Sequence, residues 1–167
     1  RAAARADELV SERPYAHPVR RATDDDAPAI GRMLHDFNTE FEDVTPGPEA
    51  LSERVRELGS RRNFVVLLAG TGPDGLAVLR FRPSIWSTAL ECYIAELYVR
   101  PARRGQGLGR ALMVEALAVA KAKGADSIDL GTSEDDVAAR ALYESLGFRN
   151  RESGPDGPVM YVYEREL

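Results

Sequence analysis

A short loop rich in glycine and arginine constrains this chain more than any other feature. It joins residues 90–99, whose apolar character predicts a buried strand, to residues 107–123, whose apolar spacing predicts a helix. Glycine allows a backbone to approach a ligand closely, and the free amides at a helix N-terminus attract anions. The loop therefore predicts a phosphate or diphosphate site. Four arginines add positive charge to it: Arg100, Arg103, Arg104 and Arg110.

The spacing of the glycines separates this loop from two familiar phosphate-binding motifs. A P-loop needs Gly-Lys followed by Ser or Thr, and the loop contains no such sequence. A dinucleotide fingerprint needs Gly-x-Gly-x-x-Gly, whereas the glycines here fall at positions 105, 107 and 109. The remaining pattern is Arg104-x-x-Gly107-x-Gly109. The alternative interpretation is a glycine-rich connection whose arginines are only solvated.

The composition is that of an ordinary globular chain with a modest negative charge. Its 167 residues suit one domain, and 44% hydrophobic residues can supply a core. The chain has 22 basic and 27 acidic residues, a net charge of −5, which argues against nucleic acid as a partner. Its apolar runs are too short to cross a membrane. The single cysteine, Cys92, excludes an internal disulfide and a cysteine-rich zinc site, and it fits a cytoplasmic location.

Apolar spacing and turn residues predict an α/β domain with a mixed, mostly antiparallel sheet flanked by helices. We expect the domain to occupy residues 19–167, after a loosely ordered arm over residues 1–18. The predicted order is β-α-α-β-β-β-α-β-α-β-β. In chain order the segments are 19–22, 24–41, a helix that ends at Gly59, 64–69, 76–82, 90–99, 107–123, 127–130, 133–146, a strand from Phe148, and 159–164. Thr23 and Ser133 are the expected caps of two of the helices.

A second segment strengthens the interpretation of the loop. It runs from Ser133 through Tyr143 to Phe148. In both segments the chain resembles the GCN5-related N-acetyltransferase (GNAT) family. The loop matches the family's Arg/Gln-x-x-Gly-x-Gly/Ala signature for acyl-CoA, and the second segment is similar to its second conserved block, with Ser133 where Asn is usual. The resemblance is strongest from Glu96 to Phe148 and implies the fold of that family.

The resemblance implies that acetyl-CoA is the acyl donor and that a primary amine attacks its thioester directly in a ternary complex. By analogy, the strand before the loop diverges from its neighbour, and the pantetheine arm lies in the gap. Backbone groups of residues 97–99 would pair with this arm, and the amides of residues 104–109 would hold the diphosphate. The implied cofactor-binding residues are Leu97, Tyr98, Val99, Arg103, Arg104, Gly105, Gln106, Gly107, Leu108, Gly109, Arg110, Ser133, Ala139 and Tyr143.

Tyr143 is the predicted general acid of this reaction. A phenol with a pKa of about 10 keeps its proton at neutral pH and can donate it to a thiolate whose pKa is about 8.5. Tyr143 also matches the family's tyrosine by its position in the second segment. The alternative is a helix tyrosine that only packs, with its hydroxyl at the surface.

Many relatives place a glutamate near the end of this strand that acts directly or through water, so the resemblance implies that Glu96 is the general base that deprotonates the ammonium group. Residues alternate faces along a strand, so Glu96 should share a face with Tyr98 and lie opposite Leu97, unless a bulge intervenes. Partial burial would raise its pKa toward the useful range. The alternatives are a solvated glutamate, a base role for Glu91 or Tyr98, and an amine that arrives already neutral.

The acceptor, meaning the amine that receives the acetyl group, is predicted from an acidic stretch. Residues 22–57 contain three arginines and ten acidic residues, a local charge of −7. Relatives build the acceptor pocket from the first two helices, their connection and the end of the sheet, so Phe37 and Glu40 are expected to line it. Trp86, in the loop before the strand 90–99, is expected either to wall this pocket or to be a surface-anchoring aromatic. A carboxylate rim would attract a cation such as a polyamine, an aminoglycoside-like sugar or a peptide amine. The alternative is a solvated acidic face.

Other functions and sites remain open at this point. The same fold could serve as a non-catalytic module that binds or senses acyl-CoA. Cys92 is expected to be a small core residue, and His17 and His35 are too isolated to predict a metal site. No membrane partner is expected. The apolar segment 159–163 could pair with a second copy of the chain in a homodimer.

Overall fold

The computed structural model of the chain describes residues 17–165, so nearly all of the expected arm at 1–18 lies outside the described residues. The elements, in chain order, are β1 Val19–Arg21, the 3₁₀ turn η1 Asp24–Asp26, α1 Ala27–Glu40, α2 Pro48–Gly59, β2 Phe64–Ala69, β3 Gly75–Pro83, β4 Leu90–Val99, the 3₁₀ turn η2 Pro101–Arg103, α3 Leu108–Ala122, β5 Ala125–Leu130 and α4 Val137–Ser145. The predicted order is confirmed through the fourth α-helix. Within 17–165, no helix is both long enough and apolar enough to cross a membrane.

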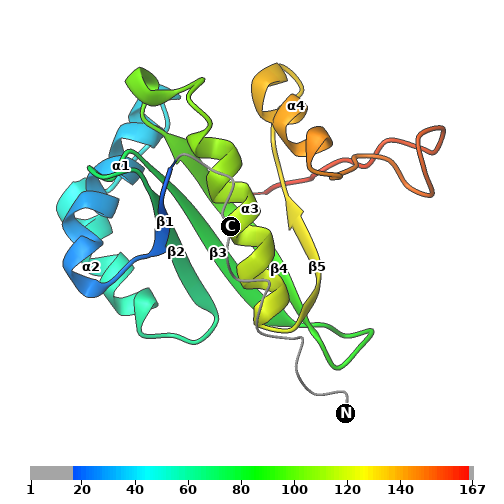
Figure 1. Ribbon diagram of the computed structural model, residues 1–167, viewed down its shortest axis with the longest axis horizontal. Helices are drawn as coiled ribbons and strands as arrows, with labels where there is room; N and C mark the ends of the chain where they lie inside the picture. The colour runs from blue at the N-terminus through cyan, green and yellow to red at the C-terminus, as the bar shows by residue number, and fades with distance from the viewer. Residues whose placement is uncertain (1–16, 166–167) are drawn as a thin grey trace, which may run out of the picture.

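The strands form one sheet in the order β1-β2-β3-β4-β5. Helices α1 and α2 cover one face and α3 covers the other (Figure 1). Neighbouring strands from β1 to β4 are antiparallel, whereas β5 runs parallel to β4. This arrangement confirms the predicted mixed, mostly antiparallel sheet flanked by helices.

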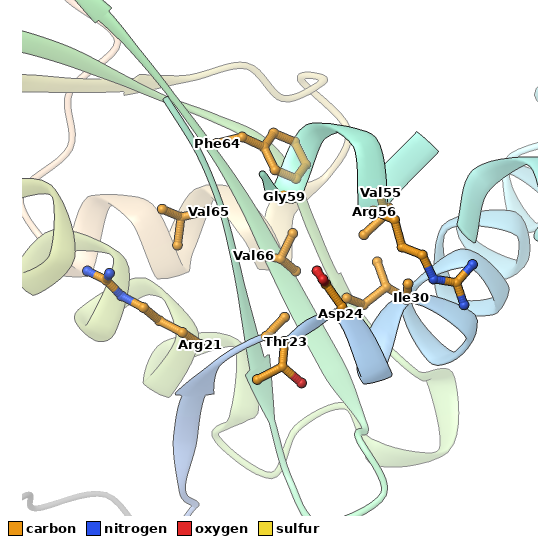
Figure 2. Close-up of a pocket in the computed structure, with 12 residues that line it drawn as sticks. Arg21, Thr23, Asp24, Ile30, Val55, Arg56, Gly59, Phe64, Val65 and Val66 are labelled. Atoms are coloured by element: carbon orange, nitrogen blue, oxygen red, sulfur yellow. The ribbon is translucent and has the colours of Figure 1, made fainter. Parts of the chain in front are cut away.

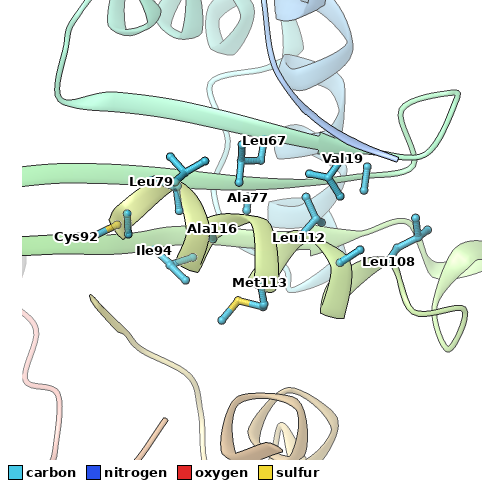
Figure 3. Packing of buried hydrophobic residues seen from close by; sticks show 14 of the residues in the cluster. Val19, Leu67, Ala77, Leu79, Cys92, Ile94, Leu108, Leu112, Met113 and Ala116 are labelled. Carbon is cyan, nitrogen blue, oxygen red and sulfur yellow. The ribbon is translucent and has the colours of Figure 1, made fainter. Parts of the chain in front are cut away.

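Each face of the sheet carries its own apolar core, because side chains alternate along every strand. On the α3 side, Leu112 and Met113 are fully buried against Leu67 and Leu79 of the sheet (Figure 3). On the opposite side, the core is formed by residues of α1, α2 and the other sheet face: Ala27, Ile30, Met33, Val55, Val66, Leu68, Leu76, Val78 and Tyr98. The two cores fix the sheet between the helix layers and so fix the position of the loop after β4.

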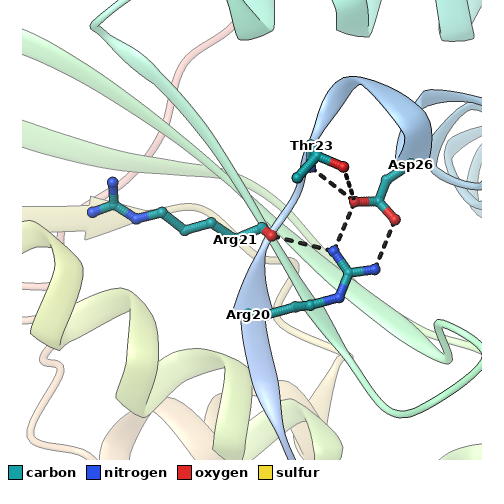
Figure 4. A network of polar contacts seen from close by, with 4 residues as sticks. All are labelled: Arg20, Arg21, Thr23 and Asp26. Atoms are coloured by element: carbon teal, nitrogen blue, oxygen red, sulfur yellow. Dashed lines mark hydrogen bonds and ion pairs between the residues drawn. The ribbon is translucent and has the colours of Figure 1, made fainter.

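The start of α1 is held by one carboxylate. Asp26 accepts two hydrogen bonds of 2.7 Å from the Arg20 guanidinium and one of 2.8 Å from the amide of Thr23 (Figure 4). The hydrogen bond from Arg20 is the largest cause of a strongly lowered pKa at Asp26. The acidic run that was expected inside the helix therefore forms the turn η1, and α1 begins directly after this turn, at Ala27.

The two strands predicted after α4 are the main difference from the expected order. In the described residues this region contains a single isolated bridge, between Arg151 and Val159. Pro155 and Pro158 interrupt the predicted hairpin, since proline has no amide hydrogen to donate to a strand ladder. Residues 159–163 are exposed. Their expected pairing with a second copy stays a prediction.

Candidate active site

Strands β4 and β5 separate halfway along β4. Hydrogen-bonded pairing joins Leu90–Ile94 to Ala125–Leu130 and ends at the pair Ile94 and Leu130. Beyond this point β4 continues to Val99, paired with β3 on its other edge. The edge of β4 that faces away from β3 is therefore unpaired by β5 from Ala95 onward, where the sequence analysis expected the pantetheine arm.

A β-bulge marks the point of separation. Glu96 pairs with Val78 and Ile94 pairs with Leu79, so Ala95 is an extra residue on β4. Leu97 packs on the α3 side, whereas Tyr98 and Val78 belong to the core on the α1 side. Directly paired residues share a face, so Glu96 lies on the α1 side with Tyr98. The expected face of Glu96 is confirmed, and the bulge is what puts it there.

The glycine loop presents a row of backbone amides at the N-terminus of α3. Gly105 and Gly107 have φ angles of +73° and +88°, a region that favours glycine. The first recorded backbone bond of the helix is from Ala111 N–H to Gly107 O, at 3.0 Å. Within residues 17–165 the amides of residues 105–110 donate to no other group. An anion could accept from them without breaking any of these bonds.

Helix α4 packs next to Gly109. A Cβ atom built on Gly109 would lie 3.5 Å from Leu142 Cδ2, an ordinary contact, so this packing does not require glycine. Leu108 is buried in the α3 core, and the Gln106 side chain donates to the carbonyl of Ala102 at 3.3 Å. The buried Leu108 side chain therefore anchors the loop to the core on the α3 side.

Three of the four loop arginines are paired with carboxylates. The pairs are Arg100 with Asp36 at 3.9 Å, Arg103 with Asp74 at 3.5 Å, and Arg104 with Glu40 at 2.6 Å. Arg110 instead donates to the Ser145 hydroxyl at 2.8 Å, with no carboxylate within ion-pair distance among the described residues. Three of the four arginines expected to add positive charge to the anion site therefore lie beside a carboxylate that offsets their charge, and their role in binding an anion stays a prediction.

Arg104 connects the loop to the end of α1. Its two terminal nitrogens donate to the Glu40 carboxylate at 2.6 and 2.7 Å, and its Nε donates to Val99 O at 2.9 Å. Its guanidinium lies 5.8 Å from the centre of the Tyr98 ring, which in turn contacts Phe37 at 5.3 Å between ring centres. The pKa of Glu40 is lowered, mainly by this hydrogen bonding to Arg104.

These contacts bear on two residues that were predicted to line an acceptor pocket. Phe37 packs against Tyr98 of β4, and its pocket role stays a prediction, whereas Glu40 is bound to the glycine loop through Arg104. The Glu40 carboxylate is engaged by Arg104 rather than available to a cationic ligand. A contact between residues 64 positions apart has no signature in the sequence.

Tyr143 lies half-buried on α4, which packs against the α3 core. Its ring contacts Phe148, with 6.1 Å between ring centres. Burial, with a smaller contribution from the charge of Asp136, raises the pKa of Tyr143 to about 12. The phenol therefore keeps its proton at neutral pH and can donate it.

Helix α4 is capped by Asp136, not by Ser133 as expected. The Asp136 carboxylate accepts a 3.0 Å hydrogen bond from the amide of Ala139. Ser133 lies in the turn before the helix, where its hydroxyl helps to lower the pKa of Asp135. Ala139 is half-buried in the first turn of the helix.

Glu96 is half-buried, and burial raises its pKa. The positive charge of Arg80 opposes this shift. A carboxylate with a raised pKa holds a proton more readily after accepting it, as a general base requires.

Two further side chains lie away from these groups. Trp86 is 91% exposed in the loop that precedes β4, whereas the glycine loop follows the other end of this strand. The structure therefore does not bring Trp86 to the site, which corrects its expected place in the acceptor pocket. Cys92 is fully buried in the α3 core, and burial raises the pKa of its thiol to about 11, so it remains a thiol.

A small cavity of about 200 Å³ lies elsewhere, between β1, α2 and the start of β2 (Figure 2). Its lining includes Ile30, Val55 and Phe64. Ile30 lies near the opposite end of α1 from Glu40, and Phe64 lies at the opposite end of the sheet from the glycine loop. None of the predicted site residues lines this cavity.

Comparison with known proteins decides the family. The model of the acetyltransferase (GNAT) family matches residues 30–148, which is most of the chain. The chain belongs to the GNAT family. Members of this family are acyl-CoA-dependent N-acetyltransferases, and acetyl-CoA is their acyl donor.

The chain is also similar to individual acetyltransferases. A solved structure from Arthrobacter sp. FB24, assigned to the acetyltransferases, is 44% identical, with a TM-score of 0.82, covering 90% of this chain and 96% of that chain. The thialysine N-epsilon-acetyltransferase of Sus scrofa is 28% identical over 144 residues, 79% of this chain and 84% of that protein. The mycothiol acetyltransferase of Beutenbergia cavernae is 41% identical over 68 residues, and this stretch is 39% of this chain but 23% of that longer protein.

The predicted role of the glycine loop as an anion site can be tested with a matched pair of glycine substitutions. Gly107 and Gly124 flank the two ends of α3 and have φ angles of +88° and +84°. Gly107→Ala and Gly124→Ala should therefore cost similar backbone strain, about 1–2 kcal/mol each. We expect Gly107→Ala to weaken coenzyme A binding about tenfold or more in calorimetry, and Gly124→Ala to leave it within about twofold. Equal affinities of the two variants would contradict the loop as the anion site.

Proposed function

We propose that this GNAT protein transfers the acetyl group of acetyl-CoA to a primary amine by direct attack in a ternary complex. The observation that carries the proposal is the separation of β4 from β5 next to a row of free amides. One feature offers backbone hydrogen bonds to an extended amide-containing arm, and the other offers them to a diphosphate. The unpaired edge of β4 begins at the bulge, next to Glu96, and continues to the glycine loop.

In this proposal the cofactor is held mainly by backbone. The β5-facing groups of residues 97–99 pair with the pantetheine arm, and the amides of residues 105–110 hold the diphosphate. Arg110 is the loop arginine whose charge has no carboxylate partner among the described residues, so it supplies the side-chain charge nearest the diphosphate. Arg103 and Arg104 act through the loop, by tying it to Asp74 and Glu40.

Glu96 and Tyr143 divide the proton transfers between them. Glu96 accepts a proton from the ammonium group of the acceptor, directly or through water, and the free amine attacks the thioester carbon. The carbon–sulfur bond breaks, and the Tyr143 hydroxyl donates its proton to the departing thiolate. Burial raises the pKa of both groups. Glu96 is therefore a stronger base than an exposed glutamate, and Tyr143 stays protonated.

A small amine is the acceptor class that the relatives support. The name of the Sus scrofa relative states that it acetylates thialysine. The structure weakens the support for the cationic acceptor predicted from the acidic stretch, because several carboxylates of that stretch are paired with arginines of this chain. These are Asp26 with Arg20, Asp36 with Arg100, Glu40 with Arg104, and Glu57 with Arg54 and Arg61. A polyamine therefore meets fewer open carboxylates than the sequence suggested.

Replacing Tyr143 by phenylalanine tests the general acid. We expect Tyr143→Phe to lower kcat by about 10²-fold or more, because a positioned proton donor contributes about 10²–10⁴-fold. The assay follows thiol release from acetyl-CoA with a panel of polyamines, aminoglycosides, amino acids and peptides. Tyr161→Phe, at a tyrosine that is 74% exposed, is the matched control and should keep full activity. Tight coenzyme A binding without turnover on any amine would instead identify a non-catalytic sensing module.

Replacing Glu96 by glutamine should lower activity and raise stability together. Its pKa is higher in the folded state, so folding favours the protonated form, and this stabilisation is lost as pH rises from the unfolded pKa through the folded one. Above its folded pKa, Glu96 places a charge in a half-buried position, and Glu96→Gln lacks this charge. We expect the variant to have a higher Tm at pH 7, with a smaller difference near pH 4, and kcat lowered about 10²-fold. A variant with a lower Tm at pH 7 and full activity would contradict both the burial argument and the base role.

A further inference from the structure

We infer that the acceptor carries a carboxylate close to its reactive amine, and that Arg80 binds this carboxylate. The inference rests on the proposed function, since it describes the acceptor of the same site. It starts from the sheet face on which Glu96 lies. Arg80 is exposed on β3 and pairs across the strands with Tyr93. Val78, two residues earlier on β3, pairs with Glu96.

This register places Arg80 and Glu96 on one face. Residues two apart on a strand share a face, so Arg80 lies on the face of Val78, which is the face of Glu96. Diagonal neighbours on an antiparallel pair have Cα atoms about 7–8 Å apart, within reach of a long arginine side chain. The charge of Arg80 is felt at Glu96, where it opposes the effect of burial.

The neighbouring arginine on the same face is already paired. The Arg82 Nε donates to the Glu91 carboxylate at 2.6 Å, and the charge of Asp129 acts on Arg82 as well. By contrast, no carboxylate among residues 17–165 lies within ion-pair distance of Arg80, and no hydrogen bond is recorded for its guanidinium there. Of these two arginines, Arg80 is the one with donors available to a ligand.

The pair of charges defines the chemistry of the acceptor. Glu96 attracts an ammonium group and takes its proton, whereas the nearby Arg80 repels a molecule that carries only positive charge. A carboxylate on the acceptor removes this repulsion and can accept two parallel hydrogen bonds from a guanidinium. The structure therefore favours amino acids, or peptides with a free carboxylate near the amine, over polyamines and aminoglycosides.

The test compares acceptors that differ only in this charge. The substrates are glycine, L-alanine, β-alanine, γ-aminobutyrate and L-lysine, each beside its own carboxamide, with phosphoethanolamine beside ethanolamine as the phosphate arm. In the wild-type protein we expect kcat/KM for at least one acid to exceed that for its amide by about tenfold or more. Arg80→Gln should bring this ratio close to one, mainly by raising KM for the acid, and Arg80→Lys should restore part of it. Arg82→Gln is the matched control and should leave the ratio unchanged.

The outcomes separate this inference from the proposed function. Transfer to amines with equal use of acids and amides overturns the role of Arg80 and leaves acetyl transfer standing. A preference for phosphoethanolamine over ethanolamine, with no preference for any acid over its amide, overturns the carboxylate assignment. An Arg80→Gln variant that loses acids and amides equally shows that Arg80 only supports the site, and so overturns the inference as well. Absence of transfer to every amine in the panel, the carboxamides and ethanolamine included, counts against the proposed function itself.

Discussion

Strand β4 is hydrogen-bonded to β3 along its whole length but to β5 along only half of it, and the site depends on this asymmetry. The extra residue Ala95 disrupts the ladder and increases the local twist, so the second half of β4 turns away from β5. An unpaired strand edge is normally a liability, because its amides and carbonyls lack partners. Here the exposed edge leads directly to the free amides of residues 105–110. One bulge thus creates a continuous surface of backbone donors and acceptors, and it also turns Glu96 toward the opposite face.

Three of the four loop arginines form ion pairs that tie the loop to neighbouring elements. Glu40 and Asp36 lie one turn apart on α1 and meet Arg104 and Arg100, which are also four residues apart. These ion pairs are partly exposed, so each contributes little to overall stability, but together they hold the last turns of α1 against the end of β4. Helix α1 and the glycine loop region are therefore joined by two ion pairs.

Sequence reasoning succeeded where the information is local. Apolar spacing predicted the elements through α4 because each buries one face, and the glycine spacing located the loop because the φ angle of Gly107 favours glycine. It failed where the outcome depends on residues far apart in the chain. The pairing of Arg104 with Glu40, the distance of Trp86 from the site and the open position of Arg80 all follow from sheet register, which no local pattern reports. The two C-terminal strands were predicted from their apolar residues alone, and the prolines between them carried the opposing signal.

The central claim is that the unpaired edge of β4 and the amides of the glycine loop hold coenzyme A. A crystal structure with coenzyme A bound tests this claim most directly. The account predicts diphosphate oxygens within hydrogen-bond distance of the amides of residues 105–110, and pantetheine amides paired with residues 97–99. A diphosphate bound elsewhere, or a β5 that is paired with β4 up to Val99 in that crystal, would contradict it.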